Sequence, residues 1–389
     1  MSRSIDGNGE RLELRKMSRR ELVVSLTALA AGAAATTAAQ APTPGRPADG
    51  GSRGGVSSAT SRSTELMHGT LQANGIAIHY VEQGRGPLVL MCHGFPESWY
   101  SWRHQLPALA AAGYRAVALD MRGYGGTSKP QAIASYSVSH LVGDVVGAIA
   151  ALGEKQAVVI GHDWGGPIAW YSALMRPDVV RAVAALSVRF NPPTALPDGV
   201  TTGQLSTSNA AGREYYRLYF LEPGRAEREL EADVRRSMLG MLYTLSGDVI
   251  RDGVRRTPFD GYFPKGQTFL QQLVTPARLP GWLSEADLAF YTEELRASGF
   301  RGGLNWYRNI DAITGIAAPF VGATIRNPAL YLYGEYDLIA GNTPDAIARM
   351  KAALPDLRGV VKMEGAGHWL QQERADDVNR ELLEFLSRL

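Results

Sequence analysis

Cysteine is almost absent from this sequence: Cys92 is the only one among 389 residues. A lone cysteine cannot form an intramolecular disulfide, and no group of Cys and His residues has the spacing of metal ligands. We therefore expect a fold that depends on its apolar core, with neither disulfide nor metal. Cys92 lies in the apolar run LVLMCHG, where a free cysteine is expected to be a buried packing residue.

An excess of charge of one sign is lacking as well. The 40 Lys and Arg residues nearly balance the 38 Asp and Glu residues, which leaves a formal net charge of +2. No basic stripe with interleaved aromatic residues is present, so there is no electrostatic case for binding nucleic acid. The 45% of hydrophobic residues are enough for one large core.

Uninterrupted apolar runs that could anchor the chain permanently in a membrane are also missing. The nearest candidate, residues 22–39, is alanine-rich and broken by threonines. It follows the basic stretch RKMSRRE and precedes AAQA, which is the arrangement of an export signal cleaved after Ala41. The paired arginines resemble the twin-arginine type, which carries folded proteins across a bacterial membrane. We expect residues 1–41 to be this signal and the processed protein to be periplasmic or secreted, without a stable membrane span; a leader with no targeting role is the alternative.

The next residues, 42–64, are rich in Pro, Gly, Ser and Arg and too poor in apolar side chains to fold alone, so we expect a disordered linker. From residue 65 onward, strand-like and helix-like runs alternate, which is the pattern of an α/β sheet. The expected strands are IAIHYVEQG, PLVLMCHG, YRAVALD, QAVVIGHD, VVRAVAALSV, NPALYLYGEYD and GVVKMEG. The clearest expected helices are VSHLVGDVVGAIAALG, PIAWYSALMRP, TPDAIARMKAALP and DDVNRELLEFLSRL.

The alternation stops between about Asn191 and Phe320. This stretch is rich in Tyr, Trp, Arg and helix formers, with residues 220–242 as its clearest helical part. We expect residues 65–190 and 321–389 to form one core, and residues 191–320 to form a mainly helical lid that carries the substrate pocket. A separate small domain is the alternative.

The segment GHDWGG at residues 161–166 places Asp163 where a strand turns into a helix. A reactive residue on such a strained turn needs small residues two positions before and two after it, and Gly161 and Gly165 meet that requirement. A carboxylate can act as a nucleophile and form an ester. A plain N-cap aspartate would not need both glycines. We therefore interpret Asp163 as the nucleophile.

An ester on Asp163 has to be hydrolysed, which requires a base and a group that orients it. GEYD places Asp337 at the end of one strand, and GAGHW places His368 after the next. The chain order of nucleophile, acid and histidine is the order found in hydrolases with this strand–turn–helix motif. Both side chains follow strand ends, where open α/β sheets hold their sites. Asp163, Asp337 and His368 are the predicted triad.

The loop HGFPESWYSWR at residues 93–103 follows an expected interior strand. Backbone N–H groups of Phe95 and Trp164 are predicted to form the oxyanion hole for the oxygen of Asp163 that becomes negative when water attacks the ester. His93 is expected to be a structural hydrogen-bonding residue, and sequence does not reveal whether the bond before Pro96 is cis. DMRGYGG, with Asp120, Arg122 and Gly123, is expected to be a structural loop.

Taken together, these motifs resemble the α/β-hydrolase-fold epoxide hydrolases over roughly residues 65–389. The resemblance implies an α/β-hydrolase fold: a mostly parallel central sheet flanked by helices, with a mainly helical lid. It also implies that two lid tyrosines hold the epoxide oxygen, and YRLYFLEPG and LNWYRN carry these roles onto Tyr216 and Tyr307. Leu221 stands where that family often has glutamine. The motifs that carry the resemblance are HGFPESWYSWR, DMRGYGGTSKP, GHDWGG, YRLYFLEPG, LNWYRN, GEYD and GAGHW.

The resemblance implies a two-step reaction on an epoxide and water, with no cofactor. Asp163 attacks an epoxide carbon while Tyr216 and Tyr307 bind the oxygen, since phenolic O–H groups can donate to it without a metal. Water activated by His368 and Asp337 then hydrolyses the ester to a diol. Pocket-lining roles are expected for Phe220, Trp306 and Trp99.

Three alternatives remain at this stage. A haloalkane dehalogenase would use the same Asp163 and His368, but many of them carry asparagine at the position of Phe95, and they lack the paired lid tyrosines. A fluoroacetate-type dehalogenase typically has a charged residue at the position of Trp164. A secreted, non-catalytic ligand-binding relative usually loses a triad member, and none is lost here. A serine hydrolase is disfavoured because there is no GxSxG motif.

Overall fold

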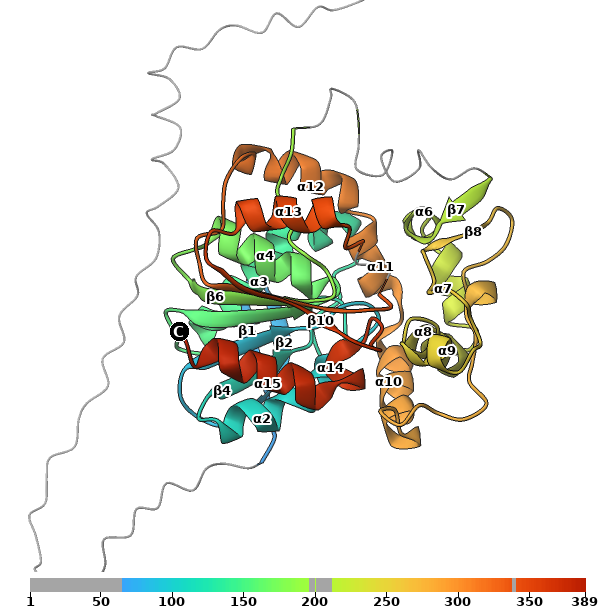
Figure 1. Cartoon of the computed structure of the whole chain (residues 1–389), viewed down its shortest axis with the longest axis horizontal. Helices are drawn as coiled ribbons and strands as arrows, with labels where there is room; N and C mark the ends of the chain where they lie inside the picture. Colours follow the sequence, from blue (N-terminus) through green and yellow to red (C-terminus); the bar gives the residue numbers. More distant parts are fainter. Residues whose placement is uncertain (1–64, 196–199, 201–211, 338–340) are drawn as a thin grey trace, which may run out of the picture. The chain divides into compact units, whose positions relative to one another are not determined.

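The computed structural model describes residues 65–195, 200, 212–337 and 341–389 (Figure 1). The predicted export signal at 1–41 and the predicted linker at 42–64 lie outside this described part, as does part of the predicted lid. Within the described residues, no helix has the length and apolar character needed to cross a membrane.

An eight-stranded sheet forms the centre of the fold. Its strand order is β1-β2-β4-β3-β5-β6-β9-β10. The pairs β1–β2 and β2–β4 are antiparallel and the other neighbours are parallel, so the predicted mostly parallel sheet is confirmed. The strands are β1 (Met67–Ala73), β2 (Ile76–Gln83), β3 (Leu88–Cys92), β4 (Arg115–Leu119), β5 (Ala157–His162), β6 (Val180–Leu186), β9 (Ala329–Gly334) and β10 (Leu357–Met363).

Helices cover both faces of this sheet, because its interior strands are apolar on both sides. Along β3, Leu90 and Cys92 face one apolar cluster while Val89 and Met91 face the other. The first cluster includes α3, α4 and α13, and the second includes α2 and α15, on opposite sides of the sheet in Figure 1. These helices are α2 (Gln105–Ala111), α3 (Val138–Ala151), α4 (Gly165–Met175), α13 (Pro344–Ala353) and α15 (Ala375–Leu386).

The edge strand β1 was not expected from the sequence. Only Leu71 of its seven residues is buried, so the strand lacks the alternating apolar pattern that identifies a half-buried strand. Backbone pairing with β2 from Met67 to Ala73 holds it in place. A strand of this kind is defined by its neighbour and not by its own composition.

The chain between β6 and β9 contains a second, two-stranded antiparallel sheet and most of the remaining helices. Residues 220–242, expected to be the clearest helical part, are divided among three helices. Pro223 and Gly224, with Gly224 at φ +82°, end α6, and Asp233 caps α8 through the N–H of Arg236. The elements are β7 (Arg213–Tyr215), α6 (Tyr216–Leu221), α7 (Arg225–Leu230), α8 (Val234–Thr244), α9 (Asp248–Arg251), β8 (Tyr262–Pro264), α10 (Glu285–Ser298), α11 (Arg301–Tyr307) and α12 (Ile310–Ala317).

Several short helices complete the described fold. They are η1 (Trp99–Trp102), η2 (Ile133–Tyr136), η3 (Leu270–Gln272), η4 (Ala318–Phe320) and α14 (Leu370–Glu373).

Candidate active site

Asp163 lies on the tight turn between β5 and α4, at φ +49°. A Cβ added at Gly161 would lie 2.0 Å from the carbonyl oxygen of Gly165, and one at Gly165 would lie 2.1 Å from the carbonyl oxygen of Cys92. The steric requirement inferred from GHDWGG is therefore real. Trp164 is the N-cap residue of α4 and no side chain caps this helix end, so Asp163 is not a capping aspartate.

The carboxylate of Asp163 is buried and held from two sides. Its Oδ1 accepts a hydrogen bond from the backbone N–H of Phe95 at 2.8 Å, and its Oδ2 lies 3.4 Å from Nε2 of His368. Burial would raise the pKa of Asp163, but the hydrogen bond and charge of His368 outweigh it, and the pKa falls below its ordinary value. Asp163 is therefore ionised at neutral pH, as a nucleophile must be.

His368 connects the two aspartates of the predicted triad. Its Nδ1 lies 2.9 Å from Oδ2 of Asp337, which follows β9, while its Nε2 faces Asp163. Burial alone would lower the pKa of His368, but the carboxylates of Asp337 and Asp163 hold it well above 6.5. The structure thus brings together three residues that lie far apart in the sequence.

This pairing predicts how stability depends on pH. A histidine whose pKa is higher in the folded state binds its proton more tightly there, so its contribution is complete below about pH 6.5 and is lost as pH rises through the folded value. We expect the free energy of unfolding to decrease above pH 6.5, and His368→Gln to reduce this decrease. Urea unfolding of both proteins between pH 6 and 9 measures the difference; identical slopes would contradict the assignment.

Ser187 is a member of the site that sequence analysis missed. It follows β6 at φ +71°, and its Oγ lies 2.5 Å from Oδ2 of Asp337 and 2.9 Å from Nδ1 of His368. Its backbone N–H donates to Leu332 and its carbonyl accepts from the hydroxyl of Tyr331. The available signal was its place at a strand end on the same edge of the sheet, but serine is common in turns.

We expect Ser187→Gly to lower kcat by roughly threefold to tenfold, because the hydroxyl bonds the charged Asp337 that orients His368. Glycine accepts the positive φ, so the variant removes the hydroxyl without adding strain. Steady-state rates across pH 5–9 are the measurement, since loss of orientation should also shift the acid limb of kcat. Wild-type kcat with an unchanged pH profile would contradict this role.

A second buried network supports His368 from the oxyanion loop. Nδ1 of His162 lies 2.8 Å from Oε2 of Glu97, and Nε2 of His162 lies 2.8 Å from the carbonyl oxygen of His368. Glu97 also accepts hydrogen bonds from the amides of Gln371 and Gln372. Sequence analysis did not single out Glu97 or His162, although both lie in the motifs that it used. The network fixes the backbone that carries the histidine.

The rest of the oxyanion loop is structural. His93 accepts a hydrogen bond at Nε2 from the N–H of Met121, and its Nδ1 lies 2.8 Å from the carbonyl oxygen of Gly94, as expected for a structural histidine. The Phe95–Pro96 peptide bond is cis.

The DMRGYGG loop is held to its neighbours by Asp120. The carboxylate of Asp120 accepts hydrogen bonds from the backbone N–H groups of Trp99 and Gly126.

Tyr216 begins α6 and Tyr307 ends α11, and the two rings lie 6.0 Å apart. The centroid of the Tyr307 ring lies 5.4 Å from that of Phe95 and 5.1 Å from that of Trp164, the two residues whose N–H groups are predicted to form the oxyanion hole. Burial raises the pKa of each phenol above 10, and the charge of Asp163 raises it further. Both hydroxyls therefore keep their protons at neutral pH and can donate.

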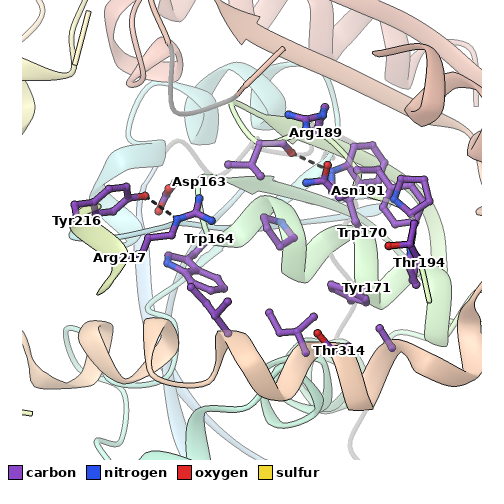
Figure 2. A pocket seen from close by; sticks show the side chains of 18 residues that line it. Asp163, Trp164, Trp170, Tyr171, Arg189, Asn191, Thr194, Tyr216, Arg217 and Thr314 are labelled. Atoms are coloured by element: carbon purple, nitrogen blue, oxygen red, sulfur yellow. Dashed lines mark hydrogen bonds between the residues drawn. The ribbon is translucent and has the colours of Figure 1, made fainter. Parts of the chain in front are cut away.

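A cavity of about 290 Å³ opens beside the nucleophile (Figure 2). Asp163, Trp164 and Tyr216 line one part of it, and the wall includes the apolar residues Trp170, Tyr171, Phe190, Ile310 and Ile313. Among the residues described, no group of three or more His, Cys, Asp or Glu side chains could hold a metal ion.

The three residues predicted to have pocket-lining roles are not among those that line this cavity. Phe220 packs behind the tyrosines, with its ring 5.5 Å from Tyr216 and 5.1 Å from Tyr307. The indole N–H of Trp306 donates to the carbonyl of Arg122, and Trp99 packs on Phe290. Tyr307, the neighbour of Trp306 on α11, is likewise buried and is not among the residues that line this cavity.

Comparison with known proteins agrees with this geometry. A family model described as alpha/beta hydrolase fold matches residues 87–228. The chain is 40% identical to epoxide hydrolase B of Mycobacterium tuberculosis over 83% of this chain and 99% of that protein, and 38% identical to epoxide hydrolase 1 of Siraitia grosvenorii with the same coverage. A solved epoxide hydrolase from an endophytic Streptomyces matches with a TM-score of 0.78 and 45% identity, covering 83% of this chain and 95% of that one. The chain therefore belongs to the epoxide hydrolases of the α/β-hydrolase fold.

Proposed function

We propose that this protein hydrolyses epoxides to vicinal diols through a covalent ester on Asp163, with residues 191–320 acting as the lid. The observation that carries the proposal is the placement of two phenols beside the buried carboxylate of Asp163: Tyr216 lines the same cavity, and the Tyr307 ring lies 6.0 Å from the Tyr216 ring, centroid to centroid. A carboxylate alone could attack many electrophiles. Two neutral O–H donors suit an epoxide, because its leaving oxygen stays attached to the substrate and needs hydrogen bonds and a proton.

In the first step, a carboxylate oxygen of Asp163 attacks one epoxide carbon and the carbon–oxygen bond of the ring breaks. The departing oxygen accepts hydrogen bonds from Tyr216 and Tyr307 and takes a proton from one of them, which leaves a hydroxyalkyl ester. The buried setting strengthens these hydrogen bonds relative to water. Tyr307 is the better-fixed donor because its ring is packed between Phe95 and Trp164.

In the second step, His368 removes a proton from water as the water attacks the ester carbonyl. The negative charge of Asp163 is one of the causes that raise the pKa of His368, and ester formation removes this charge. The pKa of His368 therefore falls in the ester, and the ring can release its proton and act as a base. The N–H of Phe95 donates to the developing oxyanion, with Trp164 as the second proposed donor. The acyl bond then breaks, and the departing oxygen of the diol takes the proton held by His368. The carboxyl group of Asp163 gives its proton back to His368, whose earlier proton has restored the tyrosine, so the diol leaves and every group regains its starting protonation state.

Isotope labelling tests this route. In a single turnover of styrene oxide in H₂¹⁸O with unlabelled enzyme, the first diol should contain unlabelled oxygen from Asp163, and the peptide that bears Asp163 should gain ¹⁸O. Direct appearance of ¹⁸O in the first diol would overturn the covalent mechanism.

The second candidate function is haloalkane dehalogenation, which would use the same Asp163 and His368. The paired phenols disfavour it, because a departing halide needs no proton. Chloride release from a chloroalkane by enzyme that forms no diol from several epoxides would establish it instead.

We also propose that the protein is exported, on the strength of the twin-arginine-like leader at residues 1–41. Cell fractionation of the full chain beside a variant with both Arg19 and Arg20 changed to Lys tests this. Equal distribution of the two proteins would contradict export by this route.

A further inference from the structure

The active-site cavity has a cationic group beside the nucleophile that the proposed reaction does not use. Arg217 follows Tyr216 on α6 and lines the same cavity as Asp163 and Tyr216. Its Nε donates a hydrogen bond to the hydroxyl oxygen of Tyr216 at 3.1 Å, marked by the dashed line in Figure 2. The guanidinium therefore lies next to the place where the substrate oxygen is proposed to bind.

Arg217 is not neutralised by an acidic side chain. Among the described residues, no carboxylate forms an ion pair with it, and its guanidinium carbon instead lies 5.6 Å and 5.7 Å from the ring centroids of Tyr215 and Tyr216. Three less exposed arginines have carboxylate partners: Arg122 with Asp144, Arg308 with Glu227 and Arg103 with Asp287. Removing part of a guanidinium from water without such a partner costs free energy, and a bound anion would offset this cost.

We propose that Arg217 binds a carboxylate attached directly to an epoxide carbon, so that the preferred substrates are 2,3-epoxycarboxylates. This proposal rests on the proposed function, since it places the epoxide oxygen on Tyr216. With that oxygen at hydrogen-bond distance from Tyr216 and the carboxylate at hydrogen-bond distance from Arg217, about 2.7–3.2 Å each, the two substrate oxygens lie close together. A carboxylate at the far end of a long chain cannot meet both groups in this way.

The chemistry of the guanidinium suits this ligand. Nε is used by Tyr216, which leaves the donors on the two terminal nitrogens for the two oxygens of a carboxylate. The positive charge also offsets the repulsion between a substrate carboxylate and the carboxylate of Asp163. The aromatic part of the wall, with Trp170, Tyr171 and Phe190, would receive an aryl or alkyl group on the other epoxide carbon. The wall also contains the polar residues Arg189, Asn191, Thr194 and Thr314.

The test compares trans-3-phenylglycidate with its neutral amide, trans-3-phenylglycidamide. For the wild type we expect kcat/KM for the carboxylate to exceed that for the amide. Arg217→Gln should lower kcat/KM for the carboxylate by roughly tenfold to a hundredfold, the range for a hydrogen bond between charged groups, and should lower that for the amide by a clearly smaller factor. Arg236→Gln, on the exposed side of α8, removes the same charge outside the cavity and should leave the ratio unchanged.

The outcomes separate this proposal from the proposed function. Equal losses for carboxylate and amide in Arg217→Gln would overturn it and show that Arg217 acts through Tyr216. A wild-type preference for the amide would also overturn it, while leaving epoxide hydrolysis intact. If neither these compounds nor styrene oxide yields a diol, the proposed function itself fails.

A measurement without turnover provides a second check in case Arg217→Gln loses activity altogether. trans-Cinnamate has the same carbon frame as the glycidate but no epoxide, and it should bind the wild type more tightly than cinnamamide does. In a correctly folded Arg217→Gln, cinnamate should lose this advantage, by roughly tenfold or more in Kd. Unchanged cinnamate affinity in the variant would overturn the proposal.

Discussion

Asp163→Asn is expected to abolish diol formation, with a loss in kcat of at least about 10⁴-fold. Asparagine keeps the shape of the side chain and can still accept the hydrogen bond from the N–H of Phe95, so the turn at φ +49° should survive. What it loses is the negative charge and with it the nucleophile. The rate of diol formation from styrene oxide, followed with purified enzyme, is the measurement.

The matched control for this variant is Asp178→Asn. Asp178 is exposed, pairs with Arg176 on the surface and lies outside the cavity, so its loss should leave kcat within about twofold of the wild type. If Asp163→Asn retained more than about a hundredth of the activity while remaining folded, another group would have to be attacking the epoxide.

His368→Gln is expected to separate the two chemical steps. Attack by Asp163 needs no base, so the first step should proceed and the ester should accumulate to about one equivalent per active site, while steady-state kcat falls by roughly 10³-fold to 10⁴-fold. Glutamine retains a polar side chain but cannot take a proton from water. Mass spectrometry of the intact protein should show a gain equal to the mass of the epoxide.

The Asp163→Asn protein treated in the same way should show no such gain, because it lacks the attacking carboxylate. A His368→Gln protein that neither gains mass nor makes diol would mean that His368 is needed before the ester forms. That outcome would require His368 to orient or ionise Asp163 through the 3.4 Å contact of its Nε2.

The parts of the site that sequence could predict are those with strict local requirements. In GHDWGG, Gly161 and Gly165 pack so closely against main-chain atoms that no side chain fits at either position. Asp163, Asp337 and His368 each follow a parallel strand, and the carboxyl ends of these strands lie at the same edge of the sheet. The interior strands were equally visible because both of their faces are buried.

The parts that sequence could not predict depend on packing between distant segments. Ser187 acquires its role only because β6 and β9 are neighbours, which brings its hydroxyl to Asp337. Arg217 becomes notable only once its lack of an acidic partner in the described fold can be seen. Trp99 is a large aromatic residue of the kind expected in a pocket, but its ring packs against Phe290 and does not line the cavity.

At one close approach of the insertion to the core, the contact is made by main chain alone. A Cβ added at Gly302 on α11 would lie 2.2 Å from the carbonyl oxygen of Gly123, so no side chain can stand between these two segments. Tyr307 is five residues further along the same helix, and its distance from the nucleophile is thereby set by backbone contact. The walls of the cavity can then change by substitution while the reactive phenol stays where it is. In such an enzyme the range of substrates can evolve, or be redesigned, without rebuilding the chemistry.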